Sequence, residues 1–297
     1  MTISEHTTPR TEILPAPARG PSRSLWRRIP LRSKVAGTII LLLIVVTASF
    51  ALIPIGDPLA GNLADRLLPI GSEGHPLGTD GQGRDMLIRL LHGTALSLFI
   101  GILPILIATV LGVVLGLAAG LGPRWLNQLV MRFGDVMFAF PGILFSLLIA
   151  VTLGVGVGTL ILALTVIWIA PIARIAETEV LRVRGLDFVA AAKVSGAGPF
   201  KVALRQVMPL ALPAVLAYAT SLVGANIAIG GGLGFIGLGV PIPTPELGAI
   251  LQELQVTVFT DPSLALLPVV VILSLAVLFP VLGDGVREGL DVRGDLA

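Results

Sequence analysis

The chain has 297 residues, of which 55% are hydrophobic and only 13% are charged. Soluble globular domains carry about 25% charged residues, so this composition indicates a protein embedded in lipid. The absence of cysteine excludes disulfides and thiolate metal sites, and three scattered histidines argue against a histidine-rich metal centre. The net charge of +2 does not indicate a nucleic-acid-binding protein.

Residues 1–34 are predicted to form a disordered cytoplasmic tail, followed by an uncleaved first helix, because the next apolar run approaches the ~20 residues that cross a bilayer. A signal-peptide core is shorter, roughly 7–15 residues. In all, six apolar stretches are long enough to span, and each can satisfy its backbone hydrogen bonds internally only as a helix. The predicted fold is therefore an all-α membrane protein with about six spans, at Val35–Ile55, Thr94–Leu121, Phe133–Leu153, Thr159–Ala176, Pro209–Gly230 and Ser263–Leu282.

Positive charge predicts the orientation of these spans. If both termini are cytoplasmic, 17 of the 20 lysines and arginines lie on the inner side, as cytoplasmic loops prefer. Residues 35–93 then hold the first helix and an outer segment, and residues 94–297 hold the remaining core. The only substantial inner connection between spans runs over residues 177–208.

The inner connection contains the stretch DFVAAAKVSGAGPFKVALRQVMP, residues 187–209. Residues 187–194 favour a helix, glycine and proline interrupt it over 195–199, and helix-compatible residues then continue into the fifth span. A short helix with small alanines, beside the apolar Phe188 and Val189, is suited to a groove on another protein. A solvated loop is the other interpretation of the same pattern.

The stretch also resembles the cytoplasmic loop signature of ABC-importer permeases, in which two alanines, a glycine and a later proline recur. Ala191, Ala192, Gly196 and Pro209 occupy the matching positions, whereas the family's usual glutamate is Ala190 here. The resemblance implies that this loop is a coupling helix that fits a cleft of an ATP-hydrolysing subunit. The implied coupling residues are Phe188, Val189, Ala190, Ala191, Ala192, Gly196, Ala197 and Pro209.

Four further segments are similar to the dipeptide, oligopeptide and nickel importer permeases, in the same order along the chain. They are residues 75–101, 134–144, 235–248 and 282–293. Two positions depart from the family, which often has glutamate where Gly230 stands and a Ser-Trp pair where Glu246 and Leu247 stand. We expect these departures to affect the outer gate or the docking of a substrate-delivery protein.

The resemblance implies a type I importer fold in the bacterial inner membrane and a non-catalytic role. This chain would form half of the pore with a second, homologous permease. Two ABC ATPase subunits would bind ATP and magnesium inside, and an extracytoplasmic substrate-binding protein would deliver di- or oligopeptides, or a related solute such as nickel or glutathione. No cofactor, metal or nucleic acid is expected on this chain. The alternative classes are an ion-coupled secondary transporter, a channel, and a structural or assembly protein.

Four other features have structural explanations that we favour. The glycines of residues 112–120 recur every four residues and indicate a helix–helix contact. Asp80 and Asp85 are expected to form local pairs and turn caps rather than a metal site. Asp135 is expected to pair with Arg132, one turn away. Asn226 either lines a pathway or bonds to a neighbouring helix, and the sequence favours the bond.

Overall fold

The computed structural model describes residues 29–52 and 56–290, and in this part of the chain there are helices and isolated bridges but no β-strand. The helices are α2 (Leu31–Leu52), α3 (Met86–Leu121), α4 (Arg124–Ala139), α5 (Gly142–Leu153), α6 (Val157–Arg184), α7 (Asp187–Val194), α8 (Pro199–Val202), α9 (Met208–Phe235), α10 (Leu247–Glu253) and α11 (Pro262–Leu290). Short helical turns lie at Leu63–Asp65 and Leu254–Thr257, and a π-helical turn over Ala203–Val207 joins α8 to α9.

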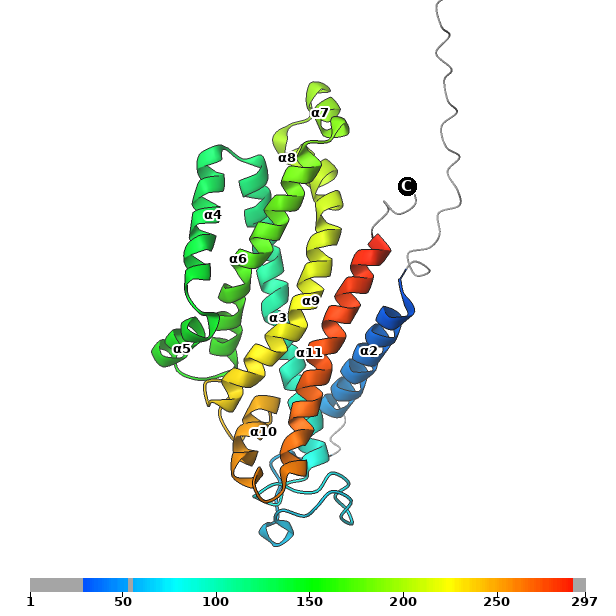
Figure 1. Ribbon diagram of the computed structural model, residues 1–297, viewed down its shortest axis with the longest axis vertical. Helices are drawn as coiled ribbons and strands as arrows, with labels where there is room; N and C mark the ends of the chain where they lie inside the picture. Colours follow the sequence, from blue (N-terminus) through cyan, green and yellow to red (C-terminus); the bar gives the residue numbers. More distant parts are fainter. Residues whose placement is uncertain (1–28, 53–55, 291–297) are drawn as a thin grey trace, which may run out of the picture.

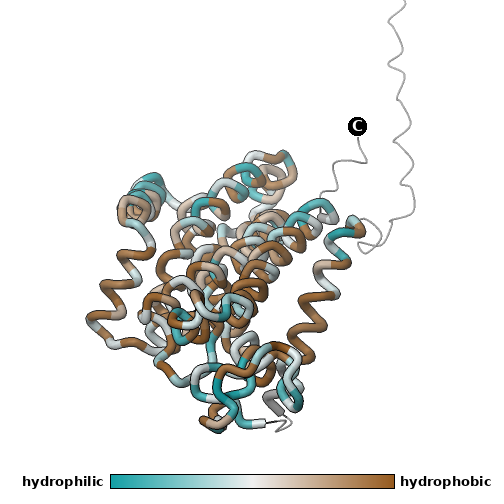
Figure 2. Tube along the Cα trace, turned by 60° about the horizontal axis from the view of Figure 1, so that its bottom comes forward, coloured by the Kyte–Doolittle hydropathy of each residue, from teal (hydrophilic) through white to brown (hydrophobic). Residues whose placement is uncertain are grey.

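The long helices form one bundle (Figure 1). Helices α3, α6 and α9 pack together in its middle, α11 packs on α9, and α2 packs on α11. Helices α4 and α5 lie on the other side, against α6. The connection with α7 and α8 projects from one end, called here the α7 end, and α10 with residues 56–85 closes the opposite end, called the α10 end. In Figure 2 the middle of the bundle is mostly hydrophobic, and hydrophilic residues gather towards its ends.

Most predicted spans correspond to observed helices. Among the described residues, four helices are long and apolar enough to cross a membrane, or five if a bent pair counts as one span. The first predicted span corresponds to α2, which has 22 residues. The second begins earlier than predicted, at Met86, because the Asp85 carboxylate caps the helix by accepting a hydrogen bond from the Ile88 N–H at 3.0 Å.

The third predicted span, Phe133–Leu153, is wrong as a single helix. Helices α4 and α5 meet at an angle of 87°. Pro141 has no N–H to donate and disfavours helical geometry in the residue before it. Phe140 accordingly adopts an extended conformation, with φ −95° and ψ 130°. The apolar composition of this stretch concealed a break that its proline dictates.

The glycine pattern of α3 makes the predicted helix–helix contact. A Cβ atom placed on Gly116 would lie 2.4 Å from the Ala176 Cβ, and one on Gly120 would lie 2.4 Å from Val180. Gly112 approaches Ile172 in the same way, at 2.7 Å. Only glycine lets the backbones of α3 and α6 come this close, so the predicted packing role of residues 112–120 is confirmed.

Parts of several predictions lie outside the described residues. These parts are the tail before residue 29, the end of the first predicted span at residues 53–55, and residues 291–297 of the carboxyl-terminal motif. The division at residues 34 and 93 stays a prediction.

Candidate functional site

The connection between α6 and α9 forms a helix, a turn and a second helix, as the sequence predicts. Helix α7 ends at Val194 with Ser195 as its C-cap, and Gly196 follows with φ +82°, a left-handed conformation that favours glycine. The Gly196 N–H donates to the Lys193 carbonyl at 3.0 Å, and the Ala197 N–H donates to the Ala192 carbonyl at 3.0 Å. These two bonds are those of a Schellman motif, so the reversal after α7 has a defined geometry.

A small apolar cluster fixes this connection to the bundle. It comprises the buried side chains Val180, Val183, Val189, Val202, Val207 and Ala211, with Leu117, Leu121 and Ala197 packed against them. Val189 is fully buried and therefore contacts its own chain rather than offering a surface for a partner. The cluster joins α7 to the ends of α3, α6 and α9, so a displacement of α7 acts directly on three long helices.

The outer surface of the connection is largely apolar. Phe188 is 40% exposed, Val194 is 90% exposed and Phe200 is 76% exposed. The small residues Ala190, Ala191 and Gly196 are exposed beside them, whereas Ala192 and Ala197 are half-buried. Large apolar side chains displayed around small residues are suited to insertion into a groove of a protein partner. Pro209 is also exposed, and it lies in the first turn of α9.

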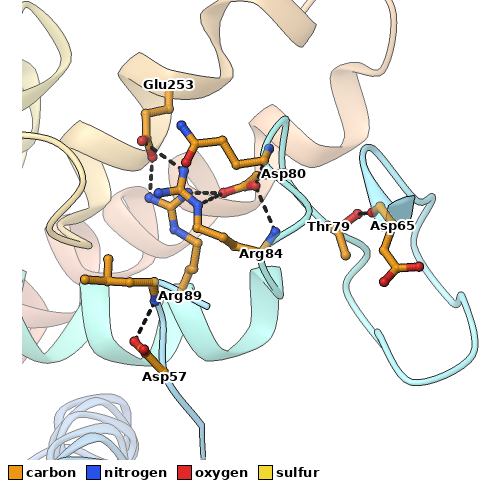
Figure 3. Close-up of polar contacts among 9 residues, drawn as sticks. Asp57, Asp65, Thr79, Asp80, Arg84, Arg89 and Glu253 are labelled. Carbon is orange, nitrogen blue, oxygen red and sulfur yellow. Dashed lines mark hydrogen bonds and ion pairs between the residues drawn. The ribbon is translucent and has the colours of Figure 1, made fainter. Parts of the chain in front are cut away.

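At the α10 end, four charged side chains form a buried cluster (Figure 3). The Arg84 Nε donates to Asp80 Oδ2 at 2.6 Å, and its Nη2 donates to Glu253 Oε1 at 2.9 Å. Arg89 also donates to both carboxylates, through Nη1 to Asp80 and through Nη2 to Glu253. Two guanidinium groups thus face two carboxylates, and together they tie residues 80–84 and the first turn of α3 to the end of α10.

The charge of Asp80 is maintained despite its burial. Burial alone raises the pKa of this carboxyl group, but two backbone N–H groups, from Arg84 and Gln82, oppose that effect. The guanidinium groups of Arg89 and Arg84 oppose it as well, and the pKa lies below its usual range. The predicted local pairing of Asp80 is therefore confirmed.

Asp85 fulfils the other half of that prediction. It caps α3, and its second oxygen lies 2.8 Å from His75 Nδ1. No group of three or more histidine, aspartate or glutamate side chains that could hold a metal occurs among residues 29–52 and 56–290.

A second buried carboxylate fixes the other end of α10. Glu246 caps this helix by accepting a hydrogen bond from the Ala249 N–H at 3.0 Å, and it accepts another from Ser97 Oγ at 2.8 Å. Burial raises its pKa, and the hydrogen bonds that it accepts only partly oppose this. Helix α10 is thus bound to α3 through Glu246 at its start and through Glu253 at its end.

The Asn226 side chain links three helices by hydrogen bonds. It is fully buried, its Oδ1 accepts a hydrogen bond from Trp168 Nε1 at 2.8 Å, and its Nδ2 donates to the Gly101 carbonyl at 2.8 Å and to the Ile100 carbonyl at 3.2 Å. These bonds connect α9 with α6 and α3. The geometry favours the packing interpretation, because the amide is occupied within the chain and has no exposed surface.

The predicted pairing of Asp135 with Arg132 is wrong. The Asp135 carboxylate accepts a hydrogen bond from Arg174 Nη2, on α6, and the Arg174 guanidinium lies over the Phe138 ring, 5.2 Å from its centroid. Position alone suggested a partner one turn away on α4, but the packing of α4 against α6 brings a different arginine to the carboxylate.

Comparison with known proteins identifies the family. Residues 112–291 match the family described as "Binding-protein-dependent transport system inner membrane component". The glutathione transport system permease protein GsiD of Pectobacterium atrosepticum is 34% identical over 278 residues, covering 93% of this chain and 92% of that protein. The protein of the same name from Shigella dysenteriae is 34% identical over 283 residues, covering 95% and 93%. The chain belongs to this family of ABC importer permeases.

The permease shares its fold with a solved type I importer. The inward-facing MetNI methionine ABC transporter aligns with a TM-score of 0.58 and 21% identity, over 69% of this chain and 97% of that chain. At this identity the likeness concerns the fold alone. The permease is thus an all-α, multi-pass inner-membrane protein of the type I class, as predicted.

The positions at which the permease departs from its family differ in their surroundings. Ala190 is exposed on α7, so the missing glutamate changes the outer surface of the connection. Gly230, Glu246 and Leu247 are instead buried inside the chain. Glu246 and Leu247 act on the packing of α10, whereas Gly230 lies beside Leu164 of α6 and Ile100 of α3, so none of the three itself forms a docking surface.

Sequence reasoning missed most of the charged residues at the α10 end. Arg89 and Glu253 were not singled out, although each is an ionisable residue close to a predicted span, and Glu246 was noted only as a departure from the family. Placing a charged side chain near lipid is energetically costly, so an ionisable residue beside a span should have been examined as a candidate for a buried ion pair. Their pairing was not accessible, because Glu253 lies 169 residues after Arg84 in the chain.

Proposed function

We propose that this permease forms half of the translocation pathway of an ATP-driven importer, and that separate subunits hold and hydrolyse the ATP. A second, homologous permease forms the other half. Two ABC ATPases bind at the α7 end, which is cytoplasmic, as are both termini. A soluble substrate-binding protein delivers cargo at the α10 end. The cargo is a small peptide, and the relatives named for glutathione transport support a peptide of that kind. Nickel is the other cargo class suggested by the sequence resemblance.

The observation that carries this proposal is the construction of α7 and α8. The connection displays Phe188, Val194 and Phe200 outward while Val189 anchors it inward. A loop that served only to join two helices has no need of exposed large apolar side chains on a rigid support. A docking element needs both, because the exposed residues bind the partner and the anchor transmits its movement.

The described residues suggest how such movement would reach the pathway. Helix α6 ends at Arg184 and is separated from α7 by two residues, and α8 continues through the π-helical turn into α9. When ATP closes the ATPase pair, α7 moves together with the groove of the ATPase subunit that holds it. Helices α6 and α9 then move with α7. The energy for the outward-opening state comes from ATP contacts in the closed ATPase pair, and hydrolysis resets the cycle.

The test is uptake into proteoliposomes that contain the complete importer, with and without ATP. Gly196→Pro removes an N–H that closes the Schellman motif, and it imposes φ near −65° where the chain has +82°. We expect this variant, and a deletion of residues 190–198, to abolish ATP-driven uptake without preventing membrane insertion. Gly185→Ala is the matched control, because Gly185 has φ −77° and meets no atom closer than 3.7 Å.

The alternative classes predict different results. Uptake by this chain alone, driven by an ion gradient, would indicate a secondary transporter, and conductance without an ATPase would indicate a channel. ATP-driven uptake that survives both changes to the connection would refute the assignment of α7 and α8 as the coupling element.

A further inference from the structure

Helices α4 and α5 form an outer edge of the bundle, and the chain is bent between them (Figure 1). The bend consists of Phe140 and Pro141, and both residues are exposed. On α5, Ser146 and Ala150 are buried on the side that packs against α6. The other side of α5 is apolar and exposed. We call this side, together with the bend, the bend surface: Phe140, Pro141, Ile143, Leu144, Leu147, Leu148 and Val151.

The bend lies at the level of the apolar part of α6. A Cβ atom placed on Gly142 would lie 3.4 Å from the Ile167 side chain, so the start of α5 rests on Ile167. Ile167 belongs to residues 157–173, a stretch of α6 that has no charged residue and is about 25 Å long. It lies about 15 Å from the start of this stretch and about 10 Å from Arg174, the first charged residue after it. The bend is therefore remote from both charged ends of the bundle.

The residue next to Ile167 gives the same depth independently. Trp168 donates a hydrogen bond to Asn226 of α9, which donates to the Gly101 carbonyl of α3. Gly101 lies about 22 Å from the start of α3 and about 30 Å from its end. Because the apolar core of a bilayer is about 30 Å thick, a level so far from both ends of α3 lies in hydrocarbon.

The bend leaves backbone hydrogen-bonding groups open at this depth. The Phe145 N–H donates to the Pro141 carbonyl at 3.1 Å, the first bond of the α5 ladder. Three amides precede it without a helical carbonyl to bond, those of Gly142, Ile143 and Leu144, and no side chain caps this helix start. The last carbonyl groups of α4 likewise have no helical amide after them. Irregular backbone within a membrane is tolerated only where protein buries it or a water-filled cavity reaches it.

The composition of the bend surface favours protein over water or lipid. All seven of its residues are apolar, and the two that flank the open amides, Phe140 and Ile143, are 57% and 55% exposed. Apolar side chains of this size do not suit the wall of a water-filled cavity. Lipid tails suit these side chains but cannot hydrogen-bond to the open backbone. A protein helix meets both requirements, because its apolar residues cover the surface and its polar side chains reach the backbone.

From this geometry we infer that the bend surface is the contact through which this permease binds the second permease of the importer. The ATPases and the substrate-binding protein of the proposed importer act outside the hydrocarbon, so the second permease is the partner that reaches this depth. Its contacting helix should carry small residues and a serine, threonine, asparagine or glutamine opposite the bend, since these allow close approach and hydrogen bonds between helices. This inference rests on the proposed transport function, and it adds the surface through which the two permeases pair.

Photo-cross-linking of the assembled importer in native membranes tests what covers the bend surface. A benzophenone-bearing amino acid is introduced at position Ile143 or, as the matched control, at Leu42, an exposed residue of α2 at the opposite edge of the bundle. We expect at least about tenfold more adduct with a second permease from Ile143 than from Leu42, because the reagent joins only groups in contact. Mass spectrometry identifies the adduct. Adducts with lipid alone at Ile143, or equal yields of permease adduct at both positions, would overturn the inference.

A bulky substitution tests the fit of the contact. We expect Ile143→Trp to reduce the second permease that co-purifies with this chain about tenfold, because overpacking a close contact is destabilising. Leu42→Trp makes the same kind of change on α2 and should keep the recovery within about twofold. The two variants are compared at equal amounts of chain in the membrane, so a folding defect is not mistaken for lost pairing. Equal recovery with both variants would contradict the assignment of the bend surface.

Water access separates a protein contact from a water-filled cavity. Because the chain has no cysteine, Ile143→Cys provides a single thiol, and Arg66→Cys provides an exposed one at the α10 end. In the assembled importer, a charged thiol reagent should label Ile143→Cys at least about tenfold more slowly than Arg66→Cys, since buried thiols rarely ionise. Comparable rates would indicate a water-filled cavity and overturn the inference.

Failure of this inference is distinguishable from failure of the transport proposal. ATP-driven uptake by the wild-type importer, combined with lipid adducts alone at Ile143, would refute the pairing surface and leave the transport function intact. A wild-type chain that supports no ATP-driven uptake and recovers no second permease would refute both.

Discussion

The buried charge cluster at the α10 end allows a quantitative prediction for Arg89→Met. Arg89 is 1% exposed and donates to both Asp80 and Glu253. Methionine fills a similar volume but leaves two carboxylates with the single cation of Arg84. Removal of one partner from a buried ion pair costs about 3–5 kcal/mol in general.

Two features of this cluster reduce the expected loss. Asp80 retains its two backbone N–H donors, and the Arg89 Nε is itself buried without a hydrogen-bond partner. An unsatisfied buried donor costs about 1–3 kcal/mol, and the substitution removes that penalty. We therefore expect Arg89→Met to lower the free energy of unfolding by about 2–3 kcal/mol.

The assay is denaturant unfolding in detergent, followed by the fluorescence of the three tryptophans. Arg66→Met is the control, because Arg66 is exposed at the same end of the bundle and its loss should change stability by about 0.5 kcal/mol or less. Adding Glu253→Gln to Arg89→Met restores neutrality and should recover about 1–2 kcal/mol. The reasoning is refuted if Arg89→Met resembles the control, or if the second substitution worsens the first by its full single effect.

The remaining predictions concern packing and pH. Gly116→Leu should separate α3 from α6, because even a Cβ at this position would lie 2.4 Å from the Ala176 Cβ. We expect the free energy of unfolding to fall by about 3 kcal/mol or more in the same assay. Gly158→Leu is the control, because a Cβ on Gly158 would meet no atom within 4 Å. Glu246→Gln tests the raised pKa of Glu246: the wild type loses stability as pH rises above the ordinary value of 4.5, whereas glutamine cannot ionise. The variant should therefore gain on the wild type as pH rises above 4.5, and a gap that is constant with pH would contradict the assignment. Asp80 should behave oppositely, because its pKa is lowered: the stabilising negative charge is present above the ordinary pKa of 3.8 and is lost only in more acidic solution. Unfolding of the wild type and of Asp80→Asn below about pH 4 measures this loss.

The fold was largely predictable because the hydropathy of a segment indicates whether it lies in lipid or in water. A lipid-embedded backbone has to be helical, so the positions of α3, α6, α9 and α11 follow from the length of their apolar runs. The contact between α3 and α6 was predictable for a local reason, because glycines four residues apart lie on one face. The turn after α7 was predictable because glycine marks a left-handed residue.

What the sequence did not reveal depends on contacts between distant residues. The partner of Asp135 is on another helix, 39 residues away. The burial of Val189 depends on how α7 rests against α6 and α9, since its neighbour Phe188 has the same apolar character but is exposed. The break at Pro141 was locally encoded and was overlooked because the surrounding composition is uniformly apolar. The exposed apolar surface of α7 and α8 could be found only by knowing which faces of these helices lack a neighbour.

The central claim is that α7 and α8 bind an ATP-hydrolysing subunit, and cross-linking from native membranes tests it most directly. Val194→Cys gives the otherwise cysteine-free chain one thiol at a side chain that is 90% exposed on α7. Ser72→Cys, within residues 56–85, is the control at the opposite end of the bundle. We predict that a cross-linker with one thiol-reactive and one amine-reactive end joins the Val194→Cys chain, but not the Ser72→Cys chain, to a nucleotide-binding ATPase identified by mass spectrometry. Recovery of intact chain from both variants without any ATPase adduct at Val194→Cys would contradict the account.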